Sequence, residues 1–368
     1  MADVVGAGVA EGVLQALNAY VDPWLGRSLG DLKAVRALRQ DGSQLQAELT
    51  LPVPVGGYRE ELTDALNQAL ARAGITQILQ LQLTADIPVH AVQKSLQPLP
   101  GIRNVVAVAS GKGGVGKSTV AVNLALAWAA AGARVGLLDA DIYGPSQPTM
   151  LGLAGRQATS SDGKRIDALV AHGIKAMSIG MLIDADQPMV WRGPMVTSAL
   201  TQLLSETDWG ELDYLVVDMP PGTGDIALTL AQRVPVAGAV IVTTPQDVAL
   251  ADAVKGLNMF VKVAVPILGI VENMSTHVCT HCGHEDAIFG SGGGERLAAD
   301  HQTVLLGRLP LDARIRVEAD SGVPSVVAAP DSARGKAYRD LARHTAAALA
   351  RRSRDRSSLF PKIVVEDR

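Results

Sequence analysis

The stretch Val105–Thr119, VVAVASGKGGVGKST, decides the fold of this chain of 368 residues. Its first residues, Val105 to Ala109, are small or β-branched and apolar, which predicts a buried strand. A glycine-rich loop follows, and Ser118-Thr119 then opens a long alanine-rich run, Val120–Ala131, that indicates a helix. A buried strand, a glycine loop and a helix in this order form a unit that can hold phosphate groups.

Four residues in this stretch, Gly111, Gly116, Lys117 and Ser118, satisfy the pattern G-x-x-x-x-G-K-[ST]. Glycines let backbone N–H groups approach phosphate oxygens, and the helix N-terminus adds partial positive charge at the same point. We expect Lys117 to contact the β- and γ-phosphates of ATP and the Ser118 hydroxyl to ligate Mg²⁺. The other loop residues expected to bind the nucleotide are Lys112, Gly113, Gly114, Val115 and Thr119.

Lys112 adds a second lysine to the loop, which then reads GKGGVGK. This pattern resembles the deviant P-loop ATPases related to MinD, ParA and the nitrogenase iron protein. The resemblance implies an α/β fold with a doubly wound, mostly parallel sheet. It also implies that Lys112 reaches across a dimer interface to the partner's nucleotide, so that Lys112 and Lys117 both belong to the catalytic set of a homodimer that hydrolyses ATP.

Two further buried strands end on acidic residues. Arg134–Asp139 (RVGLLD) leads to Asp141, and Tyr214–Asp218 (YLVVD) ends on Asp218. Ligands bind at the carboxyl ends of the strands in open parallel sheets. We therefore expect Asp218 to lie in the Mg²⁺ shell and Asp141 to hold the attacking water or help position Mg²⁺. Asp139 is as compatible with capping the turn as with function.

Two segments after these strands are candidates for contacts to the nucleotide. Residues 219–225, MPPGTGD, form a loop able to hold two conformations, as a γ-phosphate sensor requires, and the Gly222 N–H is a candidate γ-phosphate donor. Strand Ile267–Glu272 ends at Asn273, whose amide either reads the adenine edge, as the matching asparagine does in the deviant P-loop class, or caps a turn. Met189–Met195 (MVWRGPM) is expected either at the dimer face or as a loop anchor.

Composition narrows the class of protein. Apolar residues make up 48% of the chain and aromatic residues only 3%, so the core must be built from Ala, Val, Leu and Ile. A net charge of −4 argues against a surface that coats nucleic acid. No stretch approaches the roughly 20 apolar residues of a membrane span, and the N-terminus lacks a cationic leader. A cytoplasmic protein without nucleic-acid or membrane partners is the expectation.

Residues 1–92 are predicted to form a small α+β domain. Hydrophobic spacing indicates a helix, two strands, a helix and a strand, in the order Gly12–Tyr20, Val35–Leu38, Leu45–Leu51, Arg59–Ala73 and Ile78–Leu83. This order resembles the MIP18-type (DUF59) domain, whose D-P-x-L-G turn matches residues 22–26. The loop that carries a cysteine in many relatives is here Leu51–Gly57, LPVPVGG, so the expected role is a docking or dimer-supporting module.

The remaining boundaries follow from composition. Residues 93–103, with two prolines and a glycine, are predicted to be a linker. Residues 104–350 form the predicted ATPase domain, which contains both cysteines of the chain in a C-x-x-C pattern. Residues 351–368 are a charged tail that is expected to be loosely held.

The two cysteines of the chain, Cys279 and Cys282, are three residues apart, so both sulfurs can converge on one metal centre. Three histidines, His277, His281 and His284, offer a zinc site with mixed ligands, and a redox pair is a third option. An iron–sulfur cluster of the usual kind needs four thiolates, of which one chain supplies two. Two chains related by a twofold axis supply all of them.

Many separate motifs across residues 100–345 look like the Mrp/ApbC-type iron–sulfur cluster carrier ATPases. They are GKGGVGKST, DADIYGPS, WRGPM, DMPPGTGD, TTPQDVALAD, VENMS, CTHCG, IFGSGGG and LPLDARIRVEADSGVP. The resemblance implies ATP binding and hydrolysis, and a 4Fe–4S cluster bridged between the subunits of a homodimer by Cys279 and Cys282. It implies transfer of that cluster to apoproteins, with upstream cluster scaffolds as further partners.

Three alternatives stay open from the sequence. A MinD/ParA-like positioning ATPase would call for a basic face or an amphipathic C-terminal helix, whereas Leu359–Val365 contains a proline and no cationic amphipathic pattern. An electron-donating reductase resembling the nitrogenase iron protein would carry ligand cysteines far apart in sequence. The third alternative is a zinc-stabilised dimer without a carrier role.

Overall fold

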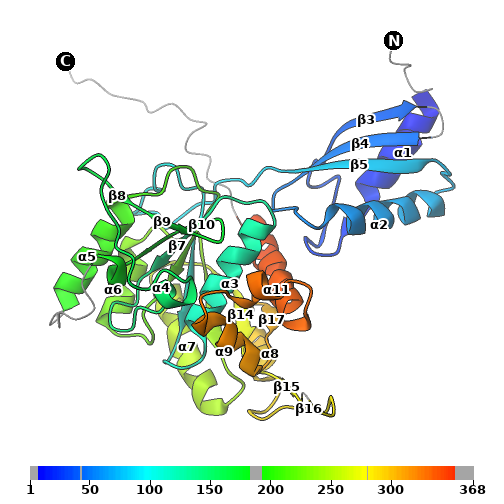
Figure 1. The fold of residues 1–368 in the computed structure, drawn as a ribbon. Helices are drawn as coiled ribbons and strands as arrows, with labels where there is room; N and C mark the ends of the chain where they lie inside the picture. Colours follow the sequence, from blue (N-terminus) through cyan, green and yellow to red (C-terminus); the bar gives the residue numbers. More distant parts are fainter. Residues whose placement is uncertain (1–6, 42–43, 183–192, 280, 353–368) are drawn as a thin grey trace, which may run out of the picture.

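A computed structural model describes residues 7–41, 44–182, 193–279 and 281–352 of the chain. Figure 1 shows a large α/β body and a smaller α+β body, joined by the segment that follows β5. Most of Met189–Met195 and residues 353–368 of the predicted tail lie outside the described residues. Within the described part of the chain, no helix is long and apolar enough to cross a membrane.

The large body is built on an eight-stranded sheet in the order β17-β14-β13-β6-β12-β7-β10-β9. All neighbours pair in parallel except β9 and β10, so the predicted doubly wound, mostly parallel fold is confirmed. The strands are β6 (Val105–Ser110), β7 (Val135–Asp139), β9 (Leu169–Ala171), β10 (Ile174–Ser178), β12 (Tyr214–Asp218), β13 (Gly238–Thr243), β14 (Ile267–Glu272) and β17 (Leu305–Arg308).

The chain winds in two directions from β6. It moves through α3 to β7 on one side, and then from β12 through α6 to β13 on the other. Because such crossovers are right-handed, α3 and α6 cover opposite faces of the sheet. The helices of this body are α3 (Lys117–Ala130), α4 (Gln147–Met150), α5 (Gly193–Glu206), α6 (Asp225–Arg233), α7 (Asp247–Lys262), α8 (Gly293–Asp300), α9 (Ala313–Asp320), α10 (Ser325–Ala328) and α11 (Ala333–Ala350).

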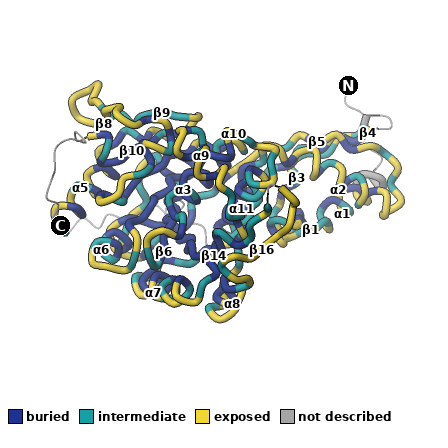
Figure 2. The backbone as a smooth tube through the Cα atoms, turned by 60° about the horizontal axis from the view of Figure 1, so that its bottom comes forward, coloured by how far each residue is buried: buried dark blue, intermediate teal, exposed yellow. Residues whose placement is uncertain are grey.

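Register brings the functional strand ends to one edge. Asp218 at the end of β12 lies opposite Asp139 at the end of β7, and β12 pairs on its other side with β6, which leads into the glycine loop. Every residue of β6, β7 and β12 is buried, and the central strands are dark blue in Figure 2. Continuous apolar strands of this kind are typical of a sheet covered on both faces.

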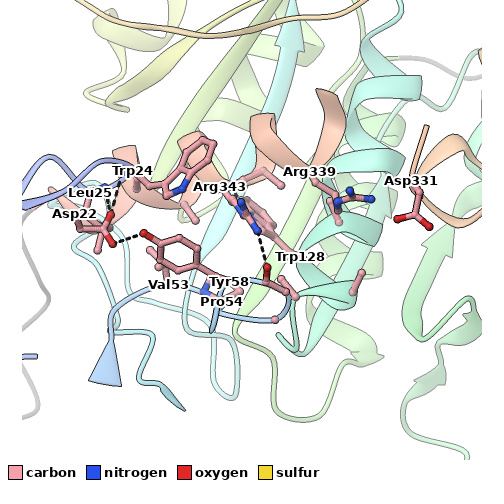
Figure 3. A pocket seen from close by; sticks show the side chains of 18 residues that line it. Asp22, Trp24, Leu25, Val53, Pro54, Tyr58, Trp128, Asp331, Arg339 and Arg343 are labelled. Carbon is pink, nitrogen blue, oxygen red and sulfur yellow. Dashed lines mark hydrogen bonds between the residues drawn. The ribbon is translucent and has the colours of Figure 1, made fainter. Parts of the chain in front are cut away.

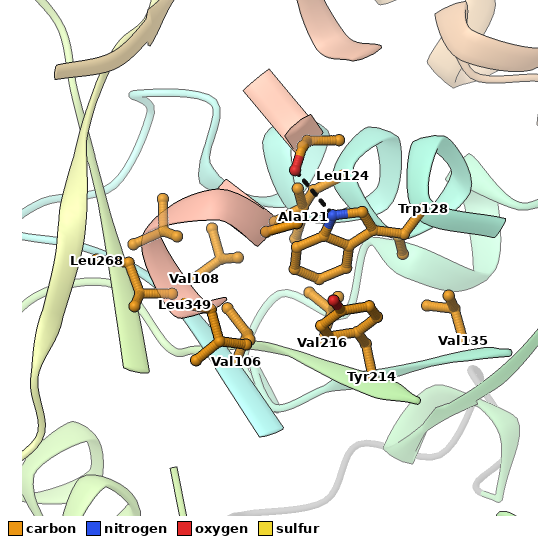
Figure 4. Close-up of a cluster of buried hydrophobic side chains, with 14 of the residues drawn as sticks. Val106, Val108, Ala121, Leu124, Trp128, Val135, Tyr214, Val216, Leu268 and Leu349 are labelled. Carbon is orange, nitrogen blue, oxygen red and sulfur yellow. Dashed lines mark hydrogen bonds between the residues drawn. The ribbon is translucent and has the colours of Figure 1, made fainter. Parts of the chain in front are cut away.

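One stacked aromatic pair lies among the aliphatic side chains drawn in Figure 4. The rings of Trp128 in α3 and Tyr214 in β12 stack with centroids 4.2 Å apart, and Trp128 Nε1 donates to the carbonyl of Ala342 in α11 at 2.9 Å. Trp128 therefore ties the helix that begins at the glycine loop to both the sheet and the C-terminal helix.

The small body contains the five predicted elements in the predicted order, and the structure adds a short antiparallel pair, β1 and β2, after the first helix. Its elements are α1 (Ala7–Ala19), β1 (Val21–Asp22), β2 (Arg27–Ser28), β3 (Val35–Asp41), β4 (Gln44–Leu51), α2 (Arg59–Arg72) and β5 (Ile78–Ala85). Strands β3 and β4 pair antiparallel, and β4 and β5 pair parallel. The buried Asp22 carboxylate organises the D-P-x-L-G turn, since it accepts from the N–H groups of Trp24 and Leu25 at 3.0 and 2.8 Å and from Tyr58 Oη at 2.7 Å.

The two bodies meet at the C-terminal end of α3. The Gly56 N–H donates to the Ala131 carbonyl at 2.9 Å, and the Arg343 guanidinium of α11 lies over Trp24 at 5.2 Å and over Tyr58 at 5.3 Å. These residues border a cavity of about 320 Å³ between the bodies, shown in Figure 3. The small domain is thus docked directly on the nucleotide-loop helix.

We predict that Gly56→Ala loosens this docking. A Cβ at Gly56 would lie 2.7 Å from Ala131 Cα and 2.9 Å from Ala131 O, so the backbones must separate at a cost of about 1 to 3 kcal/mol. Amide hydrogen exchange in the peptide covering residues 52–58 should become roughly tenfold faster. Gly12→Ala, where nothing lies within 4 Å of the new Cβ, is the control. An unchanged exchange rate in Gly56→Ala would contradict the docking contact.

Candidate functional site

The glycine loop lies between β6 and α3, as predicted. Gly114 and Gly116 have φ of 82° and 83°, and Gly116 is the N-cap of α3. A Cβ at Gly111 would lie 1.9 Å from the Asp252 carbonyl oxygen, so only glycine fits there. The loop borders a depression of about 260 Å³, and the residues that line it are Ser110, Lys112, Gly113, Gly114, Gly116, Lys117, Ser118, Thr119, Asp141, Gly144, Ser146, Met150 and Pro221.

Lys117 lies at the bottom of this depression. Its side chain is 6% exposed, forms an ion pair with the fully buried Asp218 carboxylate and donates to Ser118 Oγ at 3.1 Å. The structure thus brings together three of the predicted site residues, from the start of α3 and the end of β12. Lys112, by contrast, is partly exposed at the rim.

Gln147 is a site residue that the sequence analysis did not identify. Its Nε2 donates to Asp218 Oδ2 at 2.8 Å and to the Ser118 carbonyl at 3.0 Å, and its backbone N–H donates to Asp139 Oδ2 at 3.1 Å. The side chain is 1% exposed, and its Oε1 has no hydrogen-bond partner among the described residues. Gln147 begins α4, a helix of four residues, and carries no motif that could have singled it out.

The two acids after β7 have different surroundings. Asp139 is buried and accepts from the Asp141 N–H at 3.1 Å and from Ser178 Oγ at 3.2 Å, which is the turn-capping alternative. Burial, and then the nearby Asp218 carboxylate, raise the pKa of Asp139 above its usual range. Asp141 borders the depression and accepts from the Gly144 N–H at 3.3 Å. Partial burial raises the pKa of Asp141, and the Lys117 charge opposes that rise.

Two predicted nucleotide contacts are engaged with the protein itself. The Gly222 N–H donates to the Ser110 carbonyl at 3.0 Å, so its contact to a γ-phosphate, which stays a prediction, requires that bond to open. Asn273 Nδ2 donates to the Val115 carbonyl at 2.8 Å and is buried beneath the loop. Adenine reading by Asn273 also stays a prediction, and in this structure its amide braces the loop.

The C-x-x-C pair lies on a short hairpin formed by β15 (His277–Val278) and β16 (Glu285–Asp286). The Cys279 N–H donates to the His284 carbonyl and the Gly283 N–H to the Cys279 carbonyl, each at 2.9 Å. Figure 1 shows this hairpin projecting from the body, and Cys282 is exposed. A cluster or metal at these sulfurs would therefore be reachable from outside the chain.

The hairpin favours the thiolate form of one cysteine. Hydrogen bonds from the backbone N–H groups of Cys282 and then His281 lower the pKa of Cys279. Metal ligation uses the thiolate, so this surrounding suits a ligand. Among residues 7–352, masked gaps aside, no three His, Cys, Asp or Glu side chains are grouped to hold a metal ion. His277, one of the candidate zinc ligands, has its Nδ1 atom 3.0 Å from the Leu311 carbonyl oxygen.

Fold and site together define a P-loop NTPase of the MinD/ParA type. The chain superposes on MinD of Pyrococcus furiosus with a TM-score of 0.51 at 23% identity, covering 66% of this chain and 97% of that one. It superposes on an Archaeoglobus fulgidus nucleotide-binding protein in complex with ADP with a TM-score of 0.54 at 39% identity, covering 60% of this chain and 87% of that one.

Residues 101–346 match the family model described as ParA, NUBPL iron-transfer P-loop NTPase, and the chain belongs to this family. It is 50% identical to the iron–sulfur cluster carrier protein of Escherichia coli over 337 residues, 92% of this chain and 91% of that protein. The corresponding Haemophilus influenzae protein is 50% identical over 330 residues, 90% of this chain and 89% of that protein. A mitochondrial iron–sulfur protein required for NADH dehydrogenase from Arabidopsis thaliana is 53% identical over 252 residues, 68% of this chain and 80% of that protein.

We predict that Gly116→Ala destabilises the loop. The new Cβ would lie 2.2 Å from Asn273 Nδ2 on a backbone with φ of 83°, so both left-handed strain and a disrupted buried hydrogen bond oppose it. The loss should be about 2 to 4 kcal/mol, measured by denaturant unfolding without nucleotide. Gly113→Ala, with nothing within 4 Å of its Cβ, should change stability far less. Equal stabilities of the two variants would refute this account.

We also predict that Gln147→Glu lowers stability and nucleotide affinity. The change replaces a donor with a carboxylate against Asp218 Oδ2, inside a buried network, at a cost of about 1 to 3 kcal/mol. Gln202→Glu is a matched control, because Gln202 Nε2 also donates to a carboxylate, that of Glu206, at 2.8 Å but in solvent. It should stay within about 0.5 kcal/mol of wild type in the same unfolding assay. Similar losses in both variants would remove the assigned role of Gln147.

Proposed function

We propose that this protein is an ATP-dependent iron–sulfur cluster carrier that holds a 4Fe–4S cluster between two copies of the chain and delivers it to apoproteins. The observation that carries the proposal is the exposed C-x-x-C hairpin on the same domain as a complete phosphate loop. Membership of an iron-transfer P-loop NTPase family supports it, as do relatives at 50% identity that are named iron–sulfur cluster carriers.

The chain's own residues divide the work at the nucleotide. The loop N–H groups and the α3 N-terminus bind the phosphates, and Lys117, released from Asp218, turns to the β- and γ-phosphates. Asp141 faces the depression and orients the attacking water, whose oxygen bonds to the γ-phosphorus as the bond to the ADP oxygen breaks. Lys112 acts on the nucleotide of the facing subunit.

The donors beside Lys117 fit Mg²⁺. The Ser118 hydroxyl and the Asp218 carboxylate supply oxygen ligands, which this cation prefers, and both lie in contact with Lys117 Nζ. When bound, Mg²⁺ neutralises charge that develops on the phosphates during hydrolysis. Gln147 keeps the Asp218 carboxylate directed toward the loop.

The cargo is held by coordination across the dimer. One chain brings two thiolates, Cys279 and Cys282, and a 4Fe–4S cluster takes four, so a second copy completes the set. Ligands shared between two chains on exposed hairpins make the cluster releasable, because separation of the hairpins removes half of its ligands.

We expect anaerobic reconstitution with iron and sulfide to give a dimer with about four iron and four sulfide ions per two chains. Cys279→Ser should lose the cluster, because serine replaces a thiolate ligand. His284→Ala, which leaves both sulfurs in place, should retain it. The iron content, the sulfide content and the native mass are measured for the wild type and for both variants.

Several outcomes would overturn this function. A monomer that carries the full complement of iron, or a cluster retained in Cys279→Ser, would contradict coordination across the dimer. Zinc in place of iron in protein purified anaerobically, lost in His284→Ala as well, would replace the carrier with a zinc-stabilised dimer.

A further inference from the structure

A short segment connects the nucleotide loop to the cysteine hairpin. It begins at Asn273, whose Nδ2 donates to the Val115 carbonyl of the loop at 2.8 Å. Asn273 is 6% exposed, and its amide packs so closely beneath the loop that a Cβ at Gly116 would lie 2.2 Å from Nδ2. Six residues further along the chain is Cys279.

The far end of this segment is held along residues 309–311. The Ser275 N–H donates to the Leu309 carbonyl at 2.9 Å, and the Leu311 N–H donates to the Thr276 carbonyl at 2.9 Å. His277 Nδ1 lies 3.0 Å from the Leu311 carbonyl oxygen. Residues 275–277 are therefore bonded to residues 309–311, and we call this bonded unit the arm; it leads directly into the hairpin.

Met274 joins the arm to the residue under the loop. It adopts φ of 55°, in the left-handed region that residues other than glycine rarely occupy. Its Cε would lie 3.8 Å from a Cβ at Gly116, so its side chain also faces the loop. A bent joint between two anchored points converts a shift of the loop into a reorientation of the arm.

We propose that Asn273 is a positioning residue that transmits nucleotide occupancy from the phosphate loop to the Cys279–Cys282 hairpin. Phosphate binding orients the loop N–H groups toward the ligand, which changes the direction of the Val115 carbonyl that Asn273 holds. The inference rests on the proposed function, because it makes the hairpin the site that ATP regulates. The loop 219–224 also contacts the phosphate loop, through the Gly222 N–H and the Ser110 carbonyl, but it leads into α6.

The two cysteines make a direct readout, since they are the only thiols in the chain. The cluster-free, reduced full-length protein is treated with iodoacetamide, with and without saturating Mg–ATP, and alkylation of each cysteine is followed by mass spectrometry. We expect ATP to change the alkylation rate in wild type by about fivefold or more, the lower end of usual allosteric coupling. A wild-type rate that ATP leaves unchanged would overturn the proposal.

Two variants assign the effect to Asn273. Because Asn273 is also a candidate adenine contact, the affinity of Asn273→Ala for a fluorescent ATP analogue is titrated first, and alkylation is then compared at an ATP concentration that saturates the variant. At saturation, its alkylation rate should no longer respond to ATP. Ser275→Ala is the matched control: it lies two residues away, is 5% exposed, loses the 3.2 Å bond from Ser275 Oγ to the Leu309 carbonyl, and keeps the backbone bond from its N–H to the same carbonyl. It should respond like wild type. A full response in Asn273→Ala, or an equal loss in Ser275→Ala, would remove Asn273 from the path.

The coupling can also be measured in the opposite direction, from the cysteine hairpin to the nucleotide site, without a variant of Asn273. Coupling between two sites is reciprocal in equilibrium binding, so alkylated wild-type protein should bind the ATP analogue with a changed affinity. The factor need not equal the change in alkylation rate, because reciprocity does not extend to rates. Cys279→Ser/Cys282→Ser, exposed to the same reagent, should show no change. An unaltered affinity in alkylated wild type would contradict the coupling. All of these experiments use cluster-free protein with free thiols. Their result therefore does not depend on whether the protein binds a cluster.

Discussion

The buried charge of Lys117 is the constraint on which the nucleotide site depends. An ammonium group that is 6% exposed requires a partner, and Asp218 supplies it from the end of β12. Parallel pairing of β6 with β12 brings Lys117 and Asp218 into contact, because the carboxyl end of β12 then lies beside the loop that follows β6. Gln147 then fixes the second oxygen of the same carboxylate. In the proposed mechanism, phosphate binding exchanges one anionic partner of Lys117, the Asp218 carboxylate, for another.

Three segments lead from the phosphate loop to other parts of the molecule. Helix α3 runs 14 residues, about 20 Å, from the loop to the contact with the small domain. The segment from Asn273 leads to the cysteine hairpin, and the loop after β12 leads into α6. An ATPase that must control a cargo site needs such connections, since its chemistry occurs at one point and its effect at another.

Much of this arrangement could be predicted from local patterns. The phosphate loop and the strands that end on Asp139 and Asp218 each carry their signal within a few consecutive residues, and the structure has them in the expected elements. The C-x-x-C spacing was also visible in the sequence, but its place on an exposed hairpin was not. Strands β9 and β10 were not predicted, because β9 is a three-residue edge strand without a buried residue and Lys175 interrupts the apolar run of β10. The Gly222 N–H is bonded to the Ser110 carbonyl, a contact between two loops that no local pattern indicates.

By itself, the sequence determined the chemistry that is available: a loop of glycines and lysines for phosphate, carboxylates at strand ends for a cation and water, and two thiolates for a metal. Tertiary structure alone decided which of these groups meet. Gln147 joins Asp218 across 71 positions of the chain, and Asn273 joins Val115 across 158. The physical reason is that such contacts follow from sheet register and crossover packing, which bring distant residues together without leaving a mark in the residues nearby.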